Sequence, residues 1–187
     1  MGHKFYKMNK VILITCLFVL STTFVVLGKL NVHQFPEPEK TSERLFYIQR
    51  SLNKNTVVYD ACFDEQGKLI ADSPVKIYWI RYDEEGQTMP LRFFEKQFAF
   101  GVKIQKLEGK NYDYKITLAA WPQRAIYLRQ LAPYKVVAYL NINGVDTELD
   151  HIFIGSDPGG SLTKAEYIEV YGVMQNSSTI NYERILL

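Results

Sequence analysis

The chain has 187 residues, of which 47% are hydrophobic and 14% aromatic, enough apolar material for a folded core. Its formal net charge is +2, but four of the 22 Lys and Arg residues precede Phe35 whereas all 20 Asp and Glu residues follow it, so the larger part of the chain is slightly acidic. This balance removes the electrostatic basis for nucleic-acid binding. Cys62 is the single cysteine after residue 30, which excludes an intramolecular disulfide in that part.

The first predicted element is a signal or anchor helix at residues 1–30. Lys4, Lys7 and Lys10 precede residues 11–27, which carry no charge, and this order is typical of a segment that directs a chain into or across a membrane. The uncharged stretch is longer than the ~7 to 15 apolar residues of a cleaved signal, but as a helix of about 26 Å it is shorter than the ~30 Å interior of a bilayer. Two alternatives are therefore open: a cleaved signal peptide, or an uncleaved anchor that contacts the membrane through residues 11–27. Either one predicts an exported protein, in the periplasm or on the extracytoplasmic face of the membrane.

Residues 31–42 are expected to be a linker. Pro36, Pro38 and a run of mixed charges disfavour a regular helix or strand there. The remainder, residues 43–187, is expected to form a single domain, because a chain of this length buries a sizeable core without disulfides.

Short runs in this domain have apolar residues at every second position, which is the period of half-buried strands. Residues 100–104 and 112–118 alternate in this way around a polar turn and predict a hairpin with one face inward. Asn53 and Asn55 are expected to form another hairpin turn, because asparagine tolerates a left-handed backbone.

The clearest hairpin signal follows residues 136–142. These lead into Asn143-Gly144, the dipeptide most typical of a two-residue turn, which would pair Ile142 with Val145. Six further strands are expected, at residues 45–50, 56–62, 75–82, 124–131, 167–174 and 180–185.

One helix is expected between these strands. Thr88 is a suitable N-cap, Pro90 suits a first turn, Phe94 and Phe98 share a helix face, and Gly101 suits the end of the helix. Sequential hairpins without β-α-β alternation predict an all-β fold, an antiparallel β-sandwich or barrel-like domain with one short helix, preceded by the N-terminal signal or anchor helix.

Four segments resemble a known family in their sequence and order. They are LFYIQRSLNKNTVVYDAC from Leu45, PVKIYWIRY from Pro74, FAFGVK from Phe98 and LAAWPQR from Leu118. Over roughly residues 35–187 the chain is similar to an uncharacterised bacterial family, domain of unknown function family 4833. The resemblance implies an exported bacterial domain, and it supplies no substrate, cofactor or catalytic residue.

Arginine recurs beside aromatic residues near predicted strand ends. Arg50 follows two aromatic residues, Arg81 lies two positions after Trp79, and Arg124 lies three positions after Trp121. A guanidinium binds carboxylate or phosphate through two hydrogen bonds and stacks on rings. The candidate site for an anionic or sugar-like ligand therefore consists of Arg50, Trp79, Arg81, Trp121 and Arg124. The alternative is that the arginines form cross-strand pairs facing solvent and the tryptophans anchor the core.

The sequence offers little for catalysis or metal binding. His151 is the only histidine after residue 42, so no metal or other cofactor is expected. Nucleophilic catalysis would need Cys62, Ser156 or Ser161 beside His151, but none of these lies in a recognised nucleophile motif. The glycine-rich stretch 155–163 lacks the spacing of a phosphate-binding loop and is expected to be a connection.

Non-catalytic binding of a small ligand, a glycan or an envelope protein is therefore the favoured function. Two alternatives are open: a structural or interaction module tethered to the membrane, and a hydrolase that uses His151.

Overall fold

The computed structural model describes residues 35–109, 111–156 and 164–187, and Phe35–Leu187 form one compact unit. The predicted signal or anchor at 1–30, the start of the predicted linker and most of the glycine-rich stretch lie outside the described residues. Within the described part, no helix has the length and apolar character needed to cross a membrane.

The described residues form strands, one short α-helix and one 3₁₀ turn. In chain order the elements are β1 (Arg44–Arg50), β2 (Asn53–Ala61), β3 (Val75–Arg81), the 3₁₀ turn η1 (Tyr82–Glu84), β4 (Gln87–Pro90), α1 (Phe93–Phe98), β5 (Val102–Lys106), β6 (Tyr114–Leu118), β7 (Trp121–Ala132), β8 (Lys135–Ile142), β9 (Val145–Ser156), β10 (Ala165–Met174) and β11 (Ile180–Leu186). The fold is therefore all-β with one short helix, as the sequence predicts.

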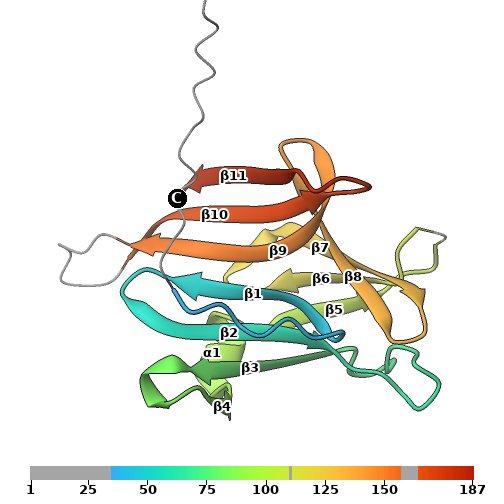
Figure 1. Cartoon of the computed structure of the whole chain (residues 1–187), viewed down its shortest axis with the longest axis horizontal. Coiled ribbons are helices and arrows are strands. Elements are labelled where there is room, and N and C mark those ends of the chain that lie inside the picture. The colour runs from blue at the N-terminus through green and yellow to red at the C-terminus, as the bar shows by residue number, and fades with distance from the viewer. Residues whose placement is uncertain (1–34, 110, 157–163) are drawn as a thin grey trace, which may run out of the picture. The chain divides into compact units, whose positions relative to one another are not determined.

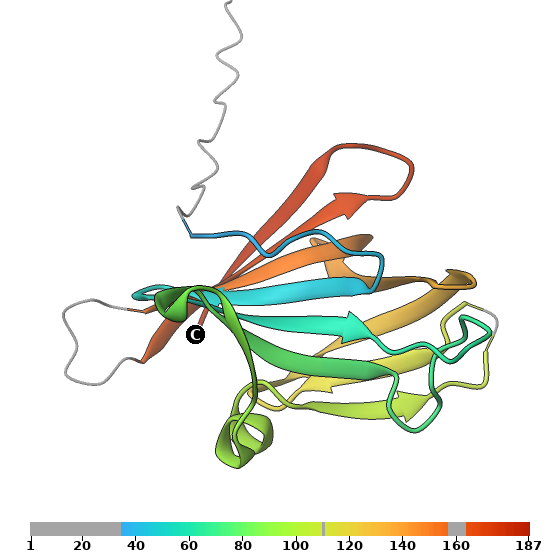
Figure 2. The same cartoon turned by 60° about the horizontal axis from the view of Figure 1, so that its bottom comes forward.

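All eleven strands belong to one sheet, in which β9 is the shared strand (Figure 1). Residues 145–148 of β9 pair with β8, and residues 151–154 pair with β1. Strand β10 pairs along the opposite edge of β9 and is followed by β11. The sheet thus divides at β9 into two branches, β1–β4 and β5–β8, and curls into a half-barrel (Figure 2).

The predicted hairpins are confirmed where the turn chemistry is local. Asn143 and Gly144 both have positive φ, 51° and 82°, as a two-residue turn of this type requires, and Ile142 pairs with Val145. Strands β5 and β6 pair as expected, with Val102 opposite Leu118.

The core lies on the concave face of the curled sheet. Phe46 and Tyr59 stack with ring centres 4.3 Å apart, and the Tyr59 hydroxyl donates a hydrogen bond of 2.7 Å to the Phe100 carbonyl. The opposing branch supplies apolar side chains at alternate positions, namely Ile116, Leu118, Ile126, Leu128, Leu140 and Ile142. The period of two in the sequence therefore sorts these residues onto one buried face.

Two features of the predicted fold class need correction. The strands form one curled sheet, so of the two predicted architectures the barrel-like one applies, as an open half-barrel. The sheet is also not wholly antiparallel, because β1 runs parallel to β9, with Tyr47 opposite His151. Parallel partners are distant in sequence, and no turn signal marks such a pair.

The predicted helix is shorter than expected. Thr88 and Pro90 lie in β4, where Pro90 is opposite Tyr78, and proline is tolerated because β4 is an edge strand. Helix α1 instead begins after Arg92, with the Glu95 side chain accepting a hydrogen bond of 2.7 Å from the Arg92 backbone. Phe94 and Phe98 do share a face, but their side chains are exposed, by 71% and 63%.

Two predicted irregular segments also differ from expectation. Residues 35–42 have no regular structure, but they pack on the sheet: Gln49 donates a hydrogen bond of 2.9 Å to the Pro36 carbonyl, and Pro38 is buried. Asn53 and Asn55 lie within β2, and the turn before it uses Leu52, whose φ is 64°. The hairpin is present and Asn53 Oδ1 accepts a hydrogen bond of 2.9 Å from the Asn55 backbone N–H, but the expected position of the turn was wrong, because the strand pairing places it earlier, next to Arg50.

Candidate functional site

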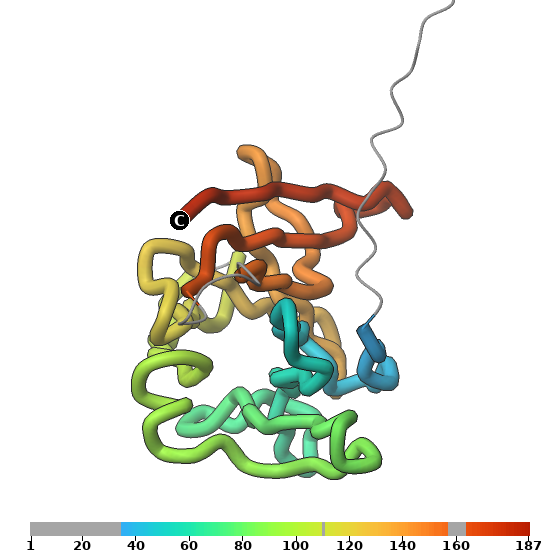
Figure 3. Tube along the Cα trace, turned by 90° about the vertical axis from the view of Figure 1, so that its left-hand side faces the viewer, coloured from blue at the N-terminus to red at the C-terminus, as the bar shows by residue number. Residues whose placement is uncertain are grey.

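An apolar cavity of about 420 Å³ lies at one end of the half-barrel. Figure 3 looks onto the end of the sheet that bears the β1–β2 turn, which is this end. Its walls come from β1, β9 and β10, from the β6–β7 turn and from the residues that follow α1. The large apolar lining residues are Ile48, Leu52, Phe100, Leu118, Trp121, Ile152, Ile154, Ile168 and Leu187.

Strand alternation explains why these residues meet. Ile48 and Arg50 are two positions apart on β1, and Ile152 and Ile154 are two positions apart on the neighbouring β9, so all four point to the concave face. Toward the end of these strands the packed core ends and the cavity begins, and Arg50 lies between the two.

Arg50 is the only charged side chain among the described residues that line the cavity. Its Nε atom is buried and has no hydrogen-bond partner in the described structure. The guanidinium carbon instead lies 5.6 Å from the centre of the Phe100 ring and 6.0 Å from that of Trp79. A contact of this kind uses the positive charge and forms no hydrogen bond, so the guanidinium N–H groups are available to another acceptor.

Burial lowers the pKa of Arg50, and the nearby charge of Glu95 opposes this effect. Glu95 is itself engaged elsewhere, since its Oε2 accepts hydrogen bonds from the Trp79 indole at 3.1 Å and from the Arg92 backbone. Arginine stays protonated at neutral pH, so the cavity wall carries a positive charge.

Leu52 forms part of the cavity rim and has an unusual backbone. Its φ of 64° is a left-handed conformation that normally favours glycine or asparagine, yet its side chain is 65% exposed. An apolar side chain in this position gains nothing from packing against the protein core. Strained residues of this kind concentrate at ligand sites.

The other sequence-predicted residues divide between the cavity and the surface. Trp121 lines the cavity, and Trp79 packs edge-on against Phe100 at 5.2 Å, behind Arg50. Arg81 forms an ion pair of 2.6 Å with Glu84 and is not among the lining residues.

Arg124 lies over the Trp121 ring, with its guanidinium carbon 5.4 Å from the ring centre. It pairs with Glu183 at 2.9 Å and also donates a hydrogen bond to the Asn141 carbonyl. Its donors therefore link β7 to β11 and β8, whereas those of Arg50 have no such partners among the described residues.

His151 lies on the convex face, opposite to the cavity. Its ring is stacked between Tyr47 at 5.0 Å and Tyr171 at 4.3 Å, and Nδ1 lies 2.7 Å from a carboxylate oxygen of Asp150. This arrangement holds the imidazole as part of an aromatic stack.

The possible nucleophiles are placed elsewhere. Burial raises the pKa of the Cys62 thiol, which is opposite to the activation that a thiolate nucleophile requires. Ser156 lines the cavity, on the other side of the sheet from His151, and its backbone N–H donates to Ser51 Oγ at 2.7 Å. Ser161 lies outside the described residues.

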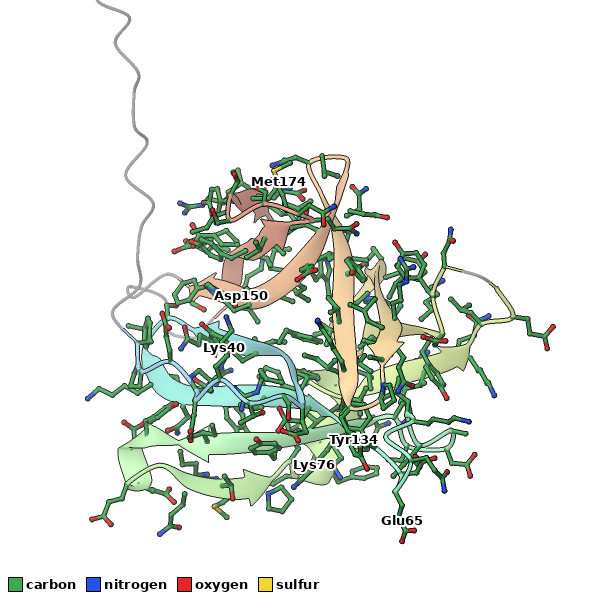
Figure 4. The ribbon with its side chains drawn as sticks, turned by 45° about the vertical axis from the view of Figure 1, so that its right-hand side comes forward. Lys40, Glu65, Lys76, Tyr134, Asp150 and Met174 are labelled. Carbon is green, nitrogen blue, oxygen red and sulfur yellow. The ribbon has the colours of Figure 1, made fainter. Side chains whose placement is uncertain are left out.

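A second depression, of about 260 Å³, has both charged and apolar walls and lies where residues 37–41 cross the sheet. Lys40 and Asp150 are near each other at this depression (Figure 4), together with the charged residues Glu37, Arg44 and Glu148. Across the described ranges, no group of three or more His, Cys, Asp or Glu side chains is arranged to hold a metal ion.

A comparison with family models decides the relationship of the chain to other proteins. The model described as Domain of unknown function (DUF4833) matches residues 46–184. The chain belongs to this family. The DUF4833 match spans both branches of the sheet and every strand except the ends of β1 and β11, and it confirms the resemblance seen in the sequence. Among curated proteins and among solved structures, nothing matches the chain.

Most of the cavity in this DUF4833 domain was not predicted from the sequence. Ile152, Ile154 and Ile168 have the same alternating pattern as core residues, and periodicity alone does not distinguish a filled face from one that borders a space. Leu52 could have been noticed in the sequence, because a leucine stands where a tight turn between two strands normally has glycine or asparagine.

Proposed function

We propose that this protein binds a small, largely apolar ligand without transforming it, and that the cavity at the end of the half-barrel is the site. The observation that carries the proposal is a cavity of about 420 Å³ with apolar walls and one charged side chain, Arg50, whose Nε has no partner among the described residues. Ligand sites are typically concave and apolar, with a few polar groups that fix orientation.

Three sequence-predicted residues support this site. Arg50 and Trp121 line the cavity, and Trp79 contacts Arg50 through its ring. Arg81 and Arg124 have ion-pair partners of their own and are assigned supporting roles outside the site.

The apolar character of the walls disfavours a glycan. A sugar carries a hydroxyl on most carbons, and each one buried without a partner costs about 1–3 kcal/mol. Apart from Arg50, the described polar lining residues are Ser51, Asn53 and Ser156, and Ser51 Oγ already accepts a hydrogen bond from Ser156. An apolar ligand with a single polar group suits this lining better.

We also propose that the domain acts outside the cytoplasm. The support is the order of Lys4, Lys7 and Lys10 before the uncharged residues 11–27. The test is a reporter enzyme that is active only after export, fused after Leu187 of the full chain. Activity equal to that of a cytoplasmic fusion control would refute export.

The binding proposal is tested by mass spectrometry of the full chain released from cells, under native and denaturing conditions. We expect a mass excess in the native spectrum that disappears on denaturation. Ala165→Phe, which adds a ring within the cavity, should reduce the excess, whereas Ala71→Phe, which adds the same ring on the exposed surface, should not. If the native mass is bare and added 1-dodecanol is not retained, ligand binding is refuted and the interaction-module alternative takes its place.

A further inference from the structure

We infer that the ligand of this cavity is an amphiphile with one anionic head group, such as a long-chain carboxylate, held by the Arg50 guanidinium with its hydrocarbon chain along Leu118, Ile152 and Ile168. The inference rests on the proposed function, because it names the class of ligand for the same site. It makes Arg50 a specificity-determining residue.

The first argument is the state of Arg50. Its guanidinium forms no hydrogen bond or ion pair with another described residue, and its Nε is buried. Burying Nε without an acceptor is costly, and the partial burial of the side chain lowers the pKa of Arg50. A carboxylate accepts two parallel hydrogen bonds from a guanidinium, which no neutral head group can match.

The second argument is the arrangement of the rings. The Arg50 guanidinium carbon lies over both rings, 5.6 Å from the centre of Phe100 and 6.0 Å from that of Trp79, and these contacts hold the side chain in position. Trp79 is in turn fixed by its hydrogen bond to Glu95. The cation is thus preorganised for an acceptor that the described protein does not supply.

The third argument is the contrast between the head and tail regions. Beyond Arg50 the walls at Leu118, Ile152 and Ile168 are hydrocarbon, and each CH₂ group buried there strengthens binding by about fourfold. At the rim, Leu52 and Leu187 remain exposed, by 65% and 63%, which provides an apolar path into the cavity. A compact anion such as inorganic phosphate would use the arginine but leave this surface uncovered.

The test uses the full chain in nanodiscs of zwitterionic lipid, with empty nanodiscs as the blank. The probes are dodecanoate and 1-dodecanol brominated at the same chain position, which quench tryptophan fluorescence on contact. The chain contains two tryptophans, and Trp121 lines the cavity. We expect dodecanoate to bind at least about tenfold more tightly than the alcohol, the range for a hydrogen bond to a charged group, and octanoate to bind more weakly than dodecanoate.

The matched variants are Arg50→Gln and Lys54→Gln. Both remove one positive charge near the same turn, but Lys54 is exposed and does not line the cavity. Arg50→Gln should abolish the preference for carboxylate over alcohol, whereas Lys54→Gln should keep it.

Equal affinity of the wild-type protein for the two probes would overturn the inference and leave the binding function standing. A preference that survives in Arg50→Gln would overturn the role of Arg50. If neither probe quenches the wild type, the inference and the proposed function both fail. The comparison of the two probes on the wild type requires no variant, so it decides the inference even if Arg50→Gln does not fold.

Discussion

The guanidinium carbon of Arg50 lies 5.6 Å from the centre of the Phe100 ring, although the two residues are 50 positions apart in the chain. Arg50 ends β1, and Phe100 follows α1, where its carbonyl accepts a hydrogen bond of 2.7 Å from Tyr59. The contact therefore joins a strand end to a loop that is itself fixed to the core. It holds a cation at the boundary between packed side chains and an open cavity.

Replacing Arg50 should not destabilise the protein, in contrast to most substitutions at half-buried sites. Arg50→Met keeps much of the side-chain volume and removes a charge without a bonding partner, so we expect the free energy of unfolding to stay equal or rise by about 1 kcal/mol. Chemical denaturation at neutral pH measures the change. A loss of about 2 kcal/mol or more would mean that the ring contacts outweigh the cost of burying the charge.

Leu52 should show a conflict between stability and binding. Asparagine tolerates the left-handed backbone at φ 64°, so Leu52→Asn should raise the free energy of unfolding by about 0.5–1 kcal/mol and weaken the binding of an apolar probe. Leu131→Asn is the control, because Leu131 is exposed but lies in β7 without positive φ. A stabilisation of equal size in both variants would show that backbone strain is not the cause.

The Arg124 and Glu183 pair should make stability depend on pH in the acid range. The hydrogen bond from Arg124 holds the pKa of Glu183 below its ordinary value of 4.5. The unfolded state therefore binds a proton at higher pH than the folded state, so the contribution is complete above about pH 4.5 and is lost as the pH falls through the lowered folded pKa.

Arg124→Gln removes this contribution. Between neutral and acid pH the variant should therefore lose about 1 kcal/mol less of its free energy of unfolding than the wild type, for a pair at this level of exposure. Denaturation curves for the wild type, Arg124→Gln and Arg129→Gln provide the measurement. Arg129 is exposed on the same strand and is a control for the loss of one cation. An identical acid dependence in the wild type and Arg124→Gln would contradict the assignment.

Phe46→Ala and Phe94→Ala remove the same atoms but should have very different effects on the free energy of unfolding. Phe46 is fully buried against Tyr59, so Phe46→Ala should lower the free energy of unfolding by about 3–5 kcal/mol. Phe94 is exposed on α1, and Phe94→Ala should change it by less than about 0.5 kcal/mol. Thermal melts compare the two, and a large loss at Phe94 would mean that the helix face is covered.

The features predicted correctly from the sequence are those determined by residues that are neighbours in the chain. Asn143-Gly144 specifies its turn through the backbone of two adjacent residues, and the pairing of Ile142 with Val145 follows directly. The parallel pair of β1 and β9 has no such marker, because its partners are remote in the chain. The helix start was misplaced at Thr88 and Pro90, since pairing with β3 overrides the local preference.

The candidate site was predictable only in part. Arg50 was selected for the aromatic residues before it, and each tryptophan for the arginine that follows it. The structure places the Arg50 guanidinium carbon 6.0 Å from the centre of the Trp79 ring and places Arg50 in the same cavity lining as Trp121. The same reasoning selected Arg124, whose donors are used by Glu183. Whether an arginine has a partner depends on residues from other strands, and this information is absent from local sequence.

The position of β9 also determines the order in which the domain can be completed. During synthesis, β1 emerges early and can pair with β2 on one edge. Its other edge has no partner until Tyr47 pairs with His151, after most of the chain has been made. The β1–β2, β5–β6 and β7–β8 hairpins form from neighbouring segments that are synthesised before that point. Closure of β1 onto β9 is therefore a late, non-local step, and until it occurs one strand edge is open to pairing with other chains.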